Sequence, residues 1–227
     1  MNAAMPVLWF FTTITLFALA DLLHRRTGGK AWAHPTLMPT LVLILVFTYT
    51  DFDFTHYQIG TRIFDLLLGG AVAALAVPLF RSRKVLATEK QAVFAATAVG
   101  SLMGVGSALC IAFLLRSPAD MVASVATKSI TTPIAVVVAP SIGGVPGLAA
   151  AVVIVTGLVV AIFGPPFLKM LGIEDDVEKG VALGTAGHAI GMAEAVRRSE
   201  LMGAAAAFSM ASNGLVTALL LPIIWPQ

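Results

Sequence analysis

The chain of 227 residues is 58% hydrophobic and only 11% charged, with a mean hydropathy of +0.93. Soluble domains carry roughly 25% charged residues, so this composition excludes an ordinary soluble domain. The formal net charge of +2 is too small to indicate a nucleic-acid-binding protein, and a single cysteine, Cys110, excludes an internal disulfide. These limits predict an all-α integral membrane protein in which residues 1–227 form a single membrane domain.

A membrane-spanning helix needs about 20 mostly apolar residues. Six segments are plausible spans, namely Met5–Leu23, Thr36–Tyr49, Phe64–Phe80, Gln91–Leu115, Val145–Leu171 and Gly203–Ile224. Two further segments, Ala119–Pro140 and Gly180–Val196, are long enough but are interrupted by polar residues. The sequence therefore predicts a polytopic bundle of seven or eight membrane segments that includes interrupted helices.

The charged residues of the loops alternate in sign along the chain. Short loops rich in Lys and Arg favour the cytoplasmic side of a membrane. If all eight segments cross, the basic loops lie inside, and the N-terminus and the acidic loops lie outside. The basic residues are Arg25, Arg26, Lys30, Arg81, Arg83, Lys84, Lys90, Arg197 and Arg198, and the acidic loops are residues 51–53 and 174–178.

The two halves of the chain resemble each other in layout. Leu68–Ala76 and Leu183–Gly191 are both small-residue segments between an acidic and a basic loop, at an offset of 115 residues. This predicts an internal two-fold repeat, residues 1–115 and 116–227, of the kind that transporters carry. Four crossings in each half would make the repeats parallel, whereas one re-entrant segment in each would make them inverted. The segments around Lys128 and His188 are the candidates for re-entrance.

Lys128 lies within an apolar stretch, where a lysine costs about 2.5–3.5 kcal/mol. Pro133 breaks the helix, and we expect Thr132 to cap a new helix that begins at Pro133. The N–H groups of that helix would point towards the break. Together with Lys128, Ser129, Thr131 and Thr132 they predict a binding site for a small carboxylate anion. The alternative is that Lys128 reaches an interface and the hydroxyl groups only satisfy a structural kink.

The second candidate site is the glycine-rich segment 184–191, which contains Thr185 and His188. Gly184 and Gly187 allow close helix packing or an unwound turn, and we place a helix break there. His188 titrates near neutral pH, so it is a candidate both for binding the anion and for carrying a coupled proton. The alternative is a histidine that only makes a hydrogen bond within the bundle.

Other polar residues give weaker signals. Glu194, close to Arg197 and Arg198, is expected to form an ion pair, and Asn213 is expected to form hydrogen bonds between helices. The histidines share no metal-ligand spacing, and the sequence has no phosphate-binding glycine loop or hydrolase motif. We therefore expect no metal, no cofactor and no enzymatic activity.

Three motifs lie in the segments 128–135, 141–146 and 180–191. They resemble signatures of the LrgB/CidB family of bacterial membrane proteins, and the match covers nearly the whole chain, including Leu75–Leu79. This resemblance implies a multi-pass protein of the bacterial cytoplasmic (inner) membrane that works beside a smaller LrgA- or CidA-like membrane partner. The motifs are Lys128-Ser129-Ile130-Thr131-Thr132-Pro133-Ile134-Ala135, Ser141-Ile142-Gly143-Gly144-Val145-Pro146 and the block from Gly180 to Gly191.

The resemblance implies two functions. Because a plastid relative exchanges glycolate and glycerate, and bacterial members are linked to pyruvate movement, the first is a secondary transporter of small monocarboxylates such as pyruvate, lactate or glycolate. The alternative is a holin- or antiholin-like modulator of murein hydrolase activity and autolysis, acting through an oligomer in the lipid membrane. The chain departs from the family pattern at Thr127, Gly70, Gly187, Glu194 and His34, and Glu194 replaces a common arginine, so no specific substrate is implied.

Overall fold

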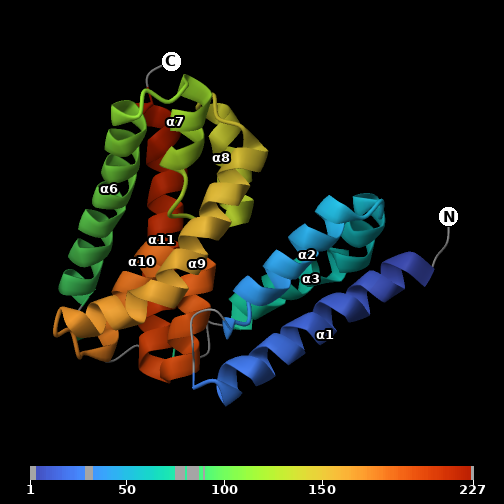
Figure 1. Cartoon of the computed structure of the whole chain (residues 1–227). Coiled ribbons are helices and arrows are strands. Elements are labelled where there is room, and N and C mark those ends of the chain that lie inside the picture. Colours follow the sequence, from blue (N-terminus) through green and yellow to red (C-terminus); the bar gives the residue numbers. More distant parts are fainter. Residues whose placement is uncertain (1–3, 29–32, 75–79, 81–86, 89, 226–227) are drawn as a thin grey trace. The chain divides into compact units, whose positions relative to one another are not determined.

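The computed structural model describes residues 4–28, 33–74, 80, 87–88 and 90–225 (Figure 1). Within these ranges the chain forms helices joined by turns and contains no strand, which confirms the predicted all-α class. The chain divides into two compact units, Met1–Ala74 and Leu75–Gln227, and each is described by itself. The predicted motif Leu75–Leu79 and the basic residues Lys30, Arg81, Arg83 and Lys84 lie outside the described residues.

Four of the described helices are long and apolar enough to cross a membrane: α1 (Ala4–Arg26), α6 (Lys90–Leu114), α9 (Pro146–Met170) and α11 (Glu200–Ile224). The apolar helices α2 (Leu37–Tyr49) and α8 (Thr132–Ser141) are shorter. A helix of 13 residues such as α2 extends about 20 Å, less than the roughly 30 Å of a hydrocarbon core. The described residues thus provide four full-length candidates, and the predicted total of seven or eight segments is not confirmed.

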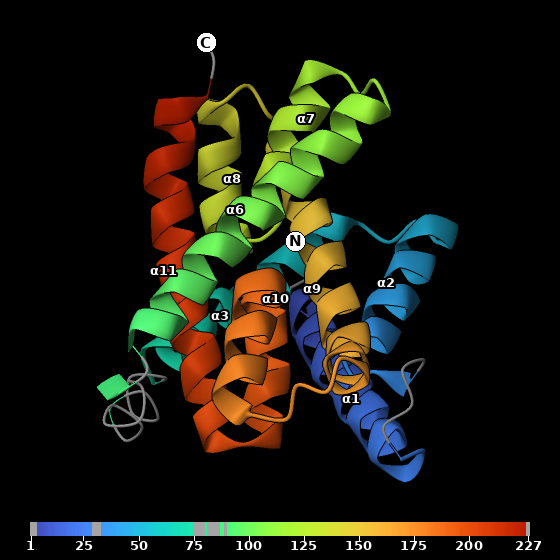
Figure 2. The same ribbon diagram turned by 90° about the vertical axis from the view of Figure 1, so that its left-hand side faces the viewer.

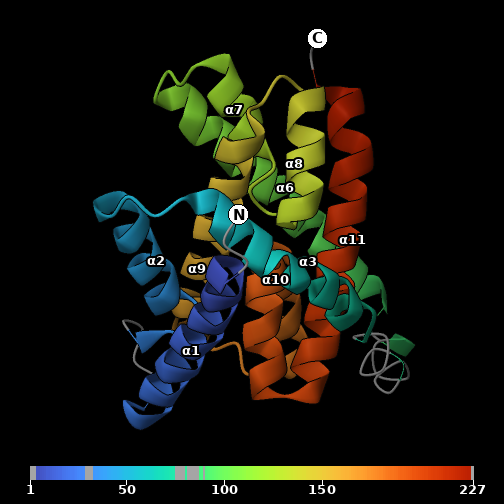
Figure 3. The ribbon, with the colours of Figure 1, turned by 90° about the vertical axis from the view of Figure 1, so that its right-hand side faces the viewer.

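The first unit consists of α1, α2 and α3 (Phe54–Ala74), in which α1 packs along α3 (Figure 3). Trp9 is buried and contacts the rings of Phe47, Phe52 and Tyr57. The sequence predicted a segment that starts at Phe64, but the helix begins ten residues earlier. The Asp53 carboxylate stabilises this earlier start, because it accepts a hydrogen bond from the Thr55 N–H at 2.8 Å.

In the second unit, the long helices α6, α9 and α11 run between two opposite ends. The C-terminal ends of α6 and α11 share a cavity of about 640 Å³ with Ser141, so we call this the Ser141 end. The C-terminal end of α9 and the start of α11 line a smaller cavity with Lys169, which marks the Lys169 end. Helices α6 and α11 therefore run towards the Ser141 end, and α9 runs back.

Helices α7 (Ala119–Ala126) and α8 form a hairpin, here called hairpin 1, with residues 127–131 at its tip. Ala119, at its start, and Ser141, at its finish, line the same cavity at the Ser141 end. The Val145 N–H donates a hydrogen bond of 2.8 Å to Ser124 Oγ, which ties the base of the hairpin together. Hairpin 1 therefore enters and leaves at one end of the unit.

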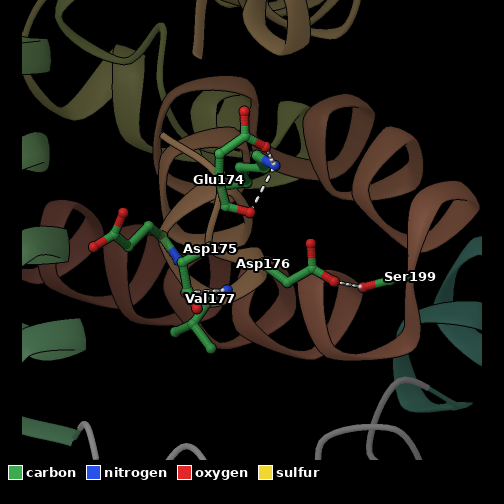
Figure 4. Close-up of polar contacts among 7 residues, drawn as sticks. Glu174, Asp175, Asp176, Val177 and Ser199 are labelled. Atoms are coloured by element: carbon green, nitrogen blue, oxygen red, sulfur yellow. Dashed lines mark hydrogen bonds and ion pairs between the residues drawn. The ribbon is translucent and has the colours of Figure 1, made fainter. Parts of the chain in front are cut away.

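Helix α10 (Asp176–Arg198) also doubles back and forms hairpin 2, with His188 at its tip. The Ser199 hydroxyl donates a hydrogen bond of 2.5 Å to the Asp176 carboxylate (Figure 4), although a straight helix of 23 residues would hold its ends about 34 Å apart. The two arms lie side by side (Figure 2), and a Cβ added at Gly191 would overlap the carbonyl group of Leu183. Both ends of hairpin 2 therefore lie at the Lys169 end.

The two hairpins change the predicted topology. An arrangement in which every segment crosses would separate the acidic loop 174–178 from Arg197 and Arg198, but the structure places them at the same end. The interrupted segments thus form hairpins, which is the geometry that the re-entrant alternative left open by the sequence requires. The internal repeat stays a prediction, and α6, which belongs to its first half, packs against α7, α10 and α11 in the second unit.

Candidate functional site

The tips of the two hairpins meet inside the second unit at Asn213, near the middle of α11. Asn213 is 1% exposed, and its side-chain nitrogen Nδ2 donates hydrogen bonds to the carbonyl oxygens of Ser129 (2.7 Å) and Thr185 (3.0 Å). Its oxygen Oδ1 accepts a hydrogen bond from Thr217 at 3.2 Å. One amide group therefore joins the two segments that the sequence singled out as candidate sites.

Lys128 is half-buried at the tip of hairpin 1. Its ammonium group donates one hydrogen bond, 3.2 Å long, to the hydroxyl of Ser129. An ammonium group has three donors, and no carboxylate pairs with Lys128 in the described part of the chain. The tip of hairpin 1 thus presents a cation with unused donors.

Helix α8 begins one residue earlier than predicted. Thr131, with extended backbone angles (φ −72°, ψ 148°), is the N-cap, and Thr132 and Pro133 occupy the first two helical positions. The Thr131 side chain accepts no capping hydrogen bond, and within the described residues the N–H groups of Thr131 and Thr132 donate to no protein acceptor. These N–H groups and the positive end of the helix dipole favour an anion beside Lys128.

His188 is buried at the tip of hairpin 2, and its Nε2 lies 2.9 Å from the carbonyl oxygen of Val153 in α9. This geometry requires a proton on Nε2, so in the neutral ring Nδ1 is an acceptor. Gly157 makes room for the ring, because a Cβ added there would collide with the imidazole. The backbone of His188 has φ 41° and ψ −133°, a conformation that non-glycine residues rarely adopt and that costs on the order of 1–3 kcal/mol.

The predicted position of the second break needs correction. Only His188 leaves helical geometry within α10, whereas Gly184 and Gly187 lie in its first arm. A Cβ at Gly184 would overlap Ala206 in α11, and one at Gly187 would collide with Val160 in α9. These two glycines therefore permit close packing of hairpin 2, and the change of direction takes place at the histidine.

Thr185 carries a buried hydroxyl group that has no hydrogen-bond partner among the described residues. Leaving a buried polar group unpaired costs about 1–3 kcal/mol, so this hydroxyl is a natural donor to a bound anion. Two glycines of α6 allow the tips to approach: a Cβ at Gly100 would lie 3.0 Å from Thr185 Cγ2, and one at Gly104 would lie 3.1 Å from Ser129 Oγ. At these two glycines, α6 thus presents a surface without side chains to both hairpins.

The charges of the site favour a single small anion. The Lys128 ammonium interacts electrostatically with the His188 ring, so the two groups repel each other when both are protonated. Glu194 does not reduce this positive charge, because it forms the expected ion pair with Arg198, at 2.7 Å. A bound carboxylate would relieve the repulsion between Lys128 and His188.

Four features of the site were not predicted from the sequence: Asn213, Gly100, Gly104 and the Val153 carbonyl. A signal for the two glycines was present, because small residues four apart on an apolar helix mark a close helix contact. Asn213 was expected to form interhelical hydrogen bonds, but its partners lie far away in the chain. No sequence signal identifies a backbone carbonyl such as that of Val153.

Known proteins resemble this chain over nearly its whole length. Residues 13–227 match the model of the LrgB-like family. The chain is 32% identical to protein YxaC of Bacillus subtilis over 92% of its own length and 90% of the relative's. It is 29% identical to a protein of Haemophilus influenzae, over 96% and 95% of the two chains. It is 27% identical to the antiholin-like protein LrgB of Bacillus mycoides, over 97% and 96%. No solved structure matches. The family match and the long apolar helices show that this chain is a membrane protein that belongs to the LrgB-like family.

Proposed function

We propose that this chain is a multi-pass protein of the bacterial cytoplasmic membrane, and that it carries a small monocarboxylate by alternating access rather than catalysing a reaction. The observation that carries the proposal is the meeting of two hairpins from opposite ends, whose residues Ser129 and Thr185 both accept a hydrogen bond from Asn213. Transporters place their substrate sites on interrupted helices near the membrane midplane, where irregular backbone is buried in protein. Hairpin 1 separates the site from the Ser141 end, and hairpin 2 separates it from the Lys169 end.

The donors at the two tips suit a carboxylate. Its two oxygens can accept from the Lys128 ammonium, from the N–H groups of Thr131 and Thr132, and from the Thr185 hydroxyl. Hydrogen bonds to a charged acceptor are short and strong, which supports retention of a small anion in apolar surroundings. The site involves both hairpins, so movement of either one opens it to a single side.

His188 is proposed as the residue that couples proton and anion binding. The neutral ring donates from Nε2 to Val153, and protonation at Nδ1 adds a second donor and a positive charge. A second cation beside Lys128 is favourable only when an anion is bound. Proton and monocarboxylate would therefore bind together.

Uptake by reconstituted protein tests this function. Liposomes that contain the wild-type protein should accumulate labelled pyruvate, lactate or glycolate, and Lys128→Ala should lower the uptake by roughly tenfold to a hundredfold, because a charged hydrogen-bond partner is lost. Lys169→Ala is the matched control, since this exposed lysine lies at the end of α9. Uptake at the wild-type level by the Lys128→Ala protein would contradict the proposed site.

A second candidate function is favoured by the name of the LrgB relatives, which are called antiholin-like. In this role the chain would modulate murein hydrolase activity as a homo-oligomer, or together with a small LrgA- or CidA-like membrane partner. Release of trapped dyes larger than a monocarboxylate from liposomes distinguishes the two candidates. Leakage that is equal for wild type and Lys128→Ala supports the oligomeric assembly, and retention of dye during monocarboxylate uptake supports the carrier.

A further inference from the structure

We infer that Asn213 is a positioning residue that latches the tip of hairpin 1 onto a fixed body made of hairpin 2 and α11. This inference deepens the proposed function, since the latch would control access to the carboxylate site from the Ser141 end. It rests on a difference in the way the two hairpins are attached to α11.

Hairpin 2 is fixed to α11 by contacts between backbones. Gly180 and Gly184 lie so close to α11 that a Cβ on either would overlap the carbonyl groups of Met202 and Ala206. In addition, the Ser209 hydroxyl donates a hydrogen bond of 3.3 Å to the carbonyl of Val181. The position of Thr185, the residue after Gly184, is therefore held whether or not Asn213 bonds to it.

The tip of hairpin 1 lacks such attachment. Within the described residues, residues 127–131 form a single hydrogen bond to a part of the chain outside hairpin 1. This is the bond from Asn213 to the Ser129 carbonyl. The other contacts of the tip with its surroundings involve no hydrogen bond in the described residues: Ile130 is buried in an apolar cluster that contains Ala149 and Val153, and Ser129 lies beside Gly104 of α6. Apolar contacts are non-directional, so this one hydrogen bond fixes the position of the tip.

The amide of Asn213 is well suited to release. Both of its N–H donors are used, one on each hairpin, and its oxygen is held by Thr217. When hairpin 1 moves away, one donor becomes free while the other bond and the Thr217 bond keep the side chain in place. The latch can therefore close again on the same carbonyl group.

Two pairs of engineered cysteines would report the position of each tip against α6. A Cβ added at Gly104 would lie 3.8 Å from the Ser129 Cβ, and one added at Gly100 would lie 3.8 Å from the Thr185 Cβ. Both distances match the Cβ separation of a disulfide, about 3.5–4.5 Å. The pairs Gly104→Cys with Ser129→Cys and Gly100→Cys with Thr185→Cys are built on a full chain carrying Cys110→Ala, which removes the native thiol.

Asn213→Asp keeps the shape of the side chain but points oxygen at two carbonyl groups. With a mild oxidant, the rate of crosslinking between positions 104 and 129 should fall about tenfold, as expected for the loss of one buried hydrogen bond. The rate between positions 100 and 185 should stay within about twofold, because that hairpin has other attachments. Asn213→Ala should give the same selective loss. Thr217→Val removes the bond that holds the Asn213 oxygen but leaves both donors in place, so it should lower the rate between positions 104 and 129 less than Asn213→Asp does.

An equal fall in both rates, or no fall in either, would overturn the latch, since a general loosening of the fold affects both hairpins. The crosslinks need no transport, so the two proposals can fail separately. A selective loss in a protein that takes up no monocarboxylate supports the latch and overturns the carrier. If the wild-type protein takes up a monocarboxylate, the Asn213→Asp variant should show a higher KM for that monocarboxylate. An unchanged KM counts against the latch.

Discussion

His188 is a histidine in a backbone conformation that normally belongs to glycine, and this single residue turns α10 back on itself. A hydrogen bond to Val153 and the space beside Gly157 hold the ring in place. Strained residues persist where the surroundings determine them, and they gather at functional sites. We therefore expect the His188 side chain to serve the proposed site, at some expense of stability.

This balance leads to a prediction for two substitutions of His188. The Ala variant loses the bond to Val153 but keeps the unfavourable φ of 41°, whereas the Gly variant loses the bond and adopts that φ without strain. We expect His188→Ala to be the less stable protein by about 1 kcal/mol, measured by thermal unfolding in detergent. Neither variant should show proton-coupled uptake.

Ala182→Gly is the matched control, because Ala182 lies in the helical first arm of the same hairpin. At position 182 the protein with Gly should be less stable than the protein with Ala by about 1 kcal/mol. This order is the opposite of the one expected at position 188. A His188→Gly protein less stable than His188→Ala would show that the backbone at the tip is not strained.

At single positions, the sequence predicted which residues belong to the site better than it predicted their backbone positions and hydrogen-bond partners. The cost of a lysine in apolar sequence indicated Lys128, and Pro133 indicated a helix break nearby. The N-cap falls at Thr131 rather than Thr132 because Pro is accommodated at either of the first helical positions, where its missing N–H is not needed. The role of Asn213 could not be predicted, since its acceptors lie 84 and 28 residues away in the chain.

At the level of elements, the packing of hairpin 2 on α11 depends on missing side chains. Gly184 faces the backbone of Ala206 and the hydroxyl of Ser209, with no space for a methyl group. Overpacking of a well-filled interior costs typically 1–3 kcal/mol. The glycines of α10 thus take the place of the apolar side chains by which most helices pack.

Gly184→Ala should therefore lower the free energy of unfolding by about 1–3 kcal/mol, because the Cβ must push α10 away from α11. The control is Gly106→Ala in α6, where an added Cβ would meet no atom within 4 Å. That variant should be as stable as wild type or slightly more stable, since Ala is the better helix former. Equal effects of the two substitutions in thermal unfolding would contradict the close packing of hairpin 2.

The sequence predicted that two segments are interrupted but could not predict that both double back. A segment of 17 to 23 residues with this length and apolar content can form either a crossing helix with some polar residues or a hairpin. In hairpin 2 the difference lies in the backbone angles of His188 and in one hydrogen bond between Asp176 and Ser199. Both depend on contacts that form only when the chain is folded.

At the scale of the whole second unit, the hairpins place the charges unevenly. Lys169, Lys179, Arg197 and Arg198 lie at the Lys169 end. Among the residues that the structure describes in this unit, Arg116 is the one Lys or Arg near the Ser141 end. Positive residues in short loops favour the cytoplasm. We therefore expect the Lys169 end to face the cytoplasm, so that hairpin 1 enters from outside and hairpin 2 from inside.

Labelling with a membrane-impermeant thiol reagent tests this topology in the Cys110→Ala background. Glu174→Cys and Glu200→Cys, on either side of hairpin 2, should both react in inside-out vesicles and be protected in right-side-out ones. Ser141→Cys is exposed at the other end and should show the reverse pattern. Reaction of positions 174 and 200 from opposite sides would mean that α10 crosses the membrane.

The shared base of hairpin 2 also has a consequence for biosynthesis. The charged residues of α10 are Asp176, Glu178, Lys179, Glu194, Arg197 and Arg198, and all of them lie in the outer parts of its two arms. If the Lys169 end faces the cytoplasm, as expected above, the hairpin returns to that side and none of these charges has to be translocated through the lipid bilayer. Only the small, nearly uncharged tip has to enter, and it needs neighbouring helices to cover it. Hairpin 2 is therefore expected to insert late, after α11 has been synthesised and has crossed beside it.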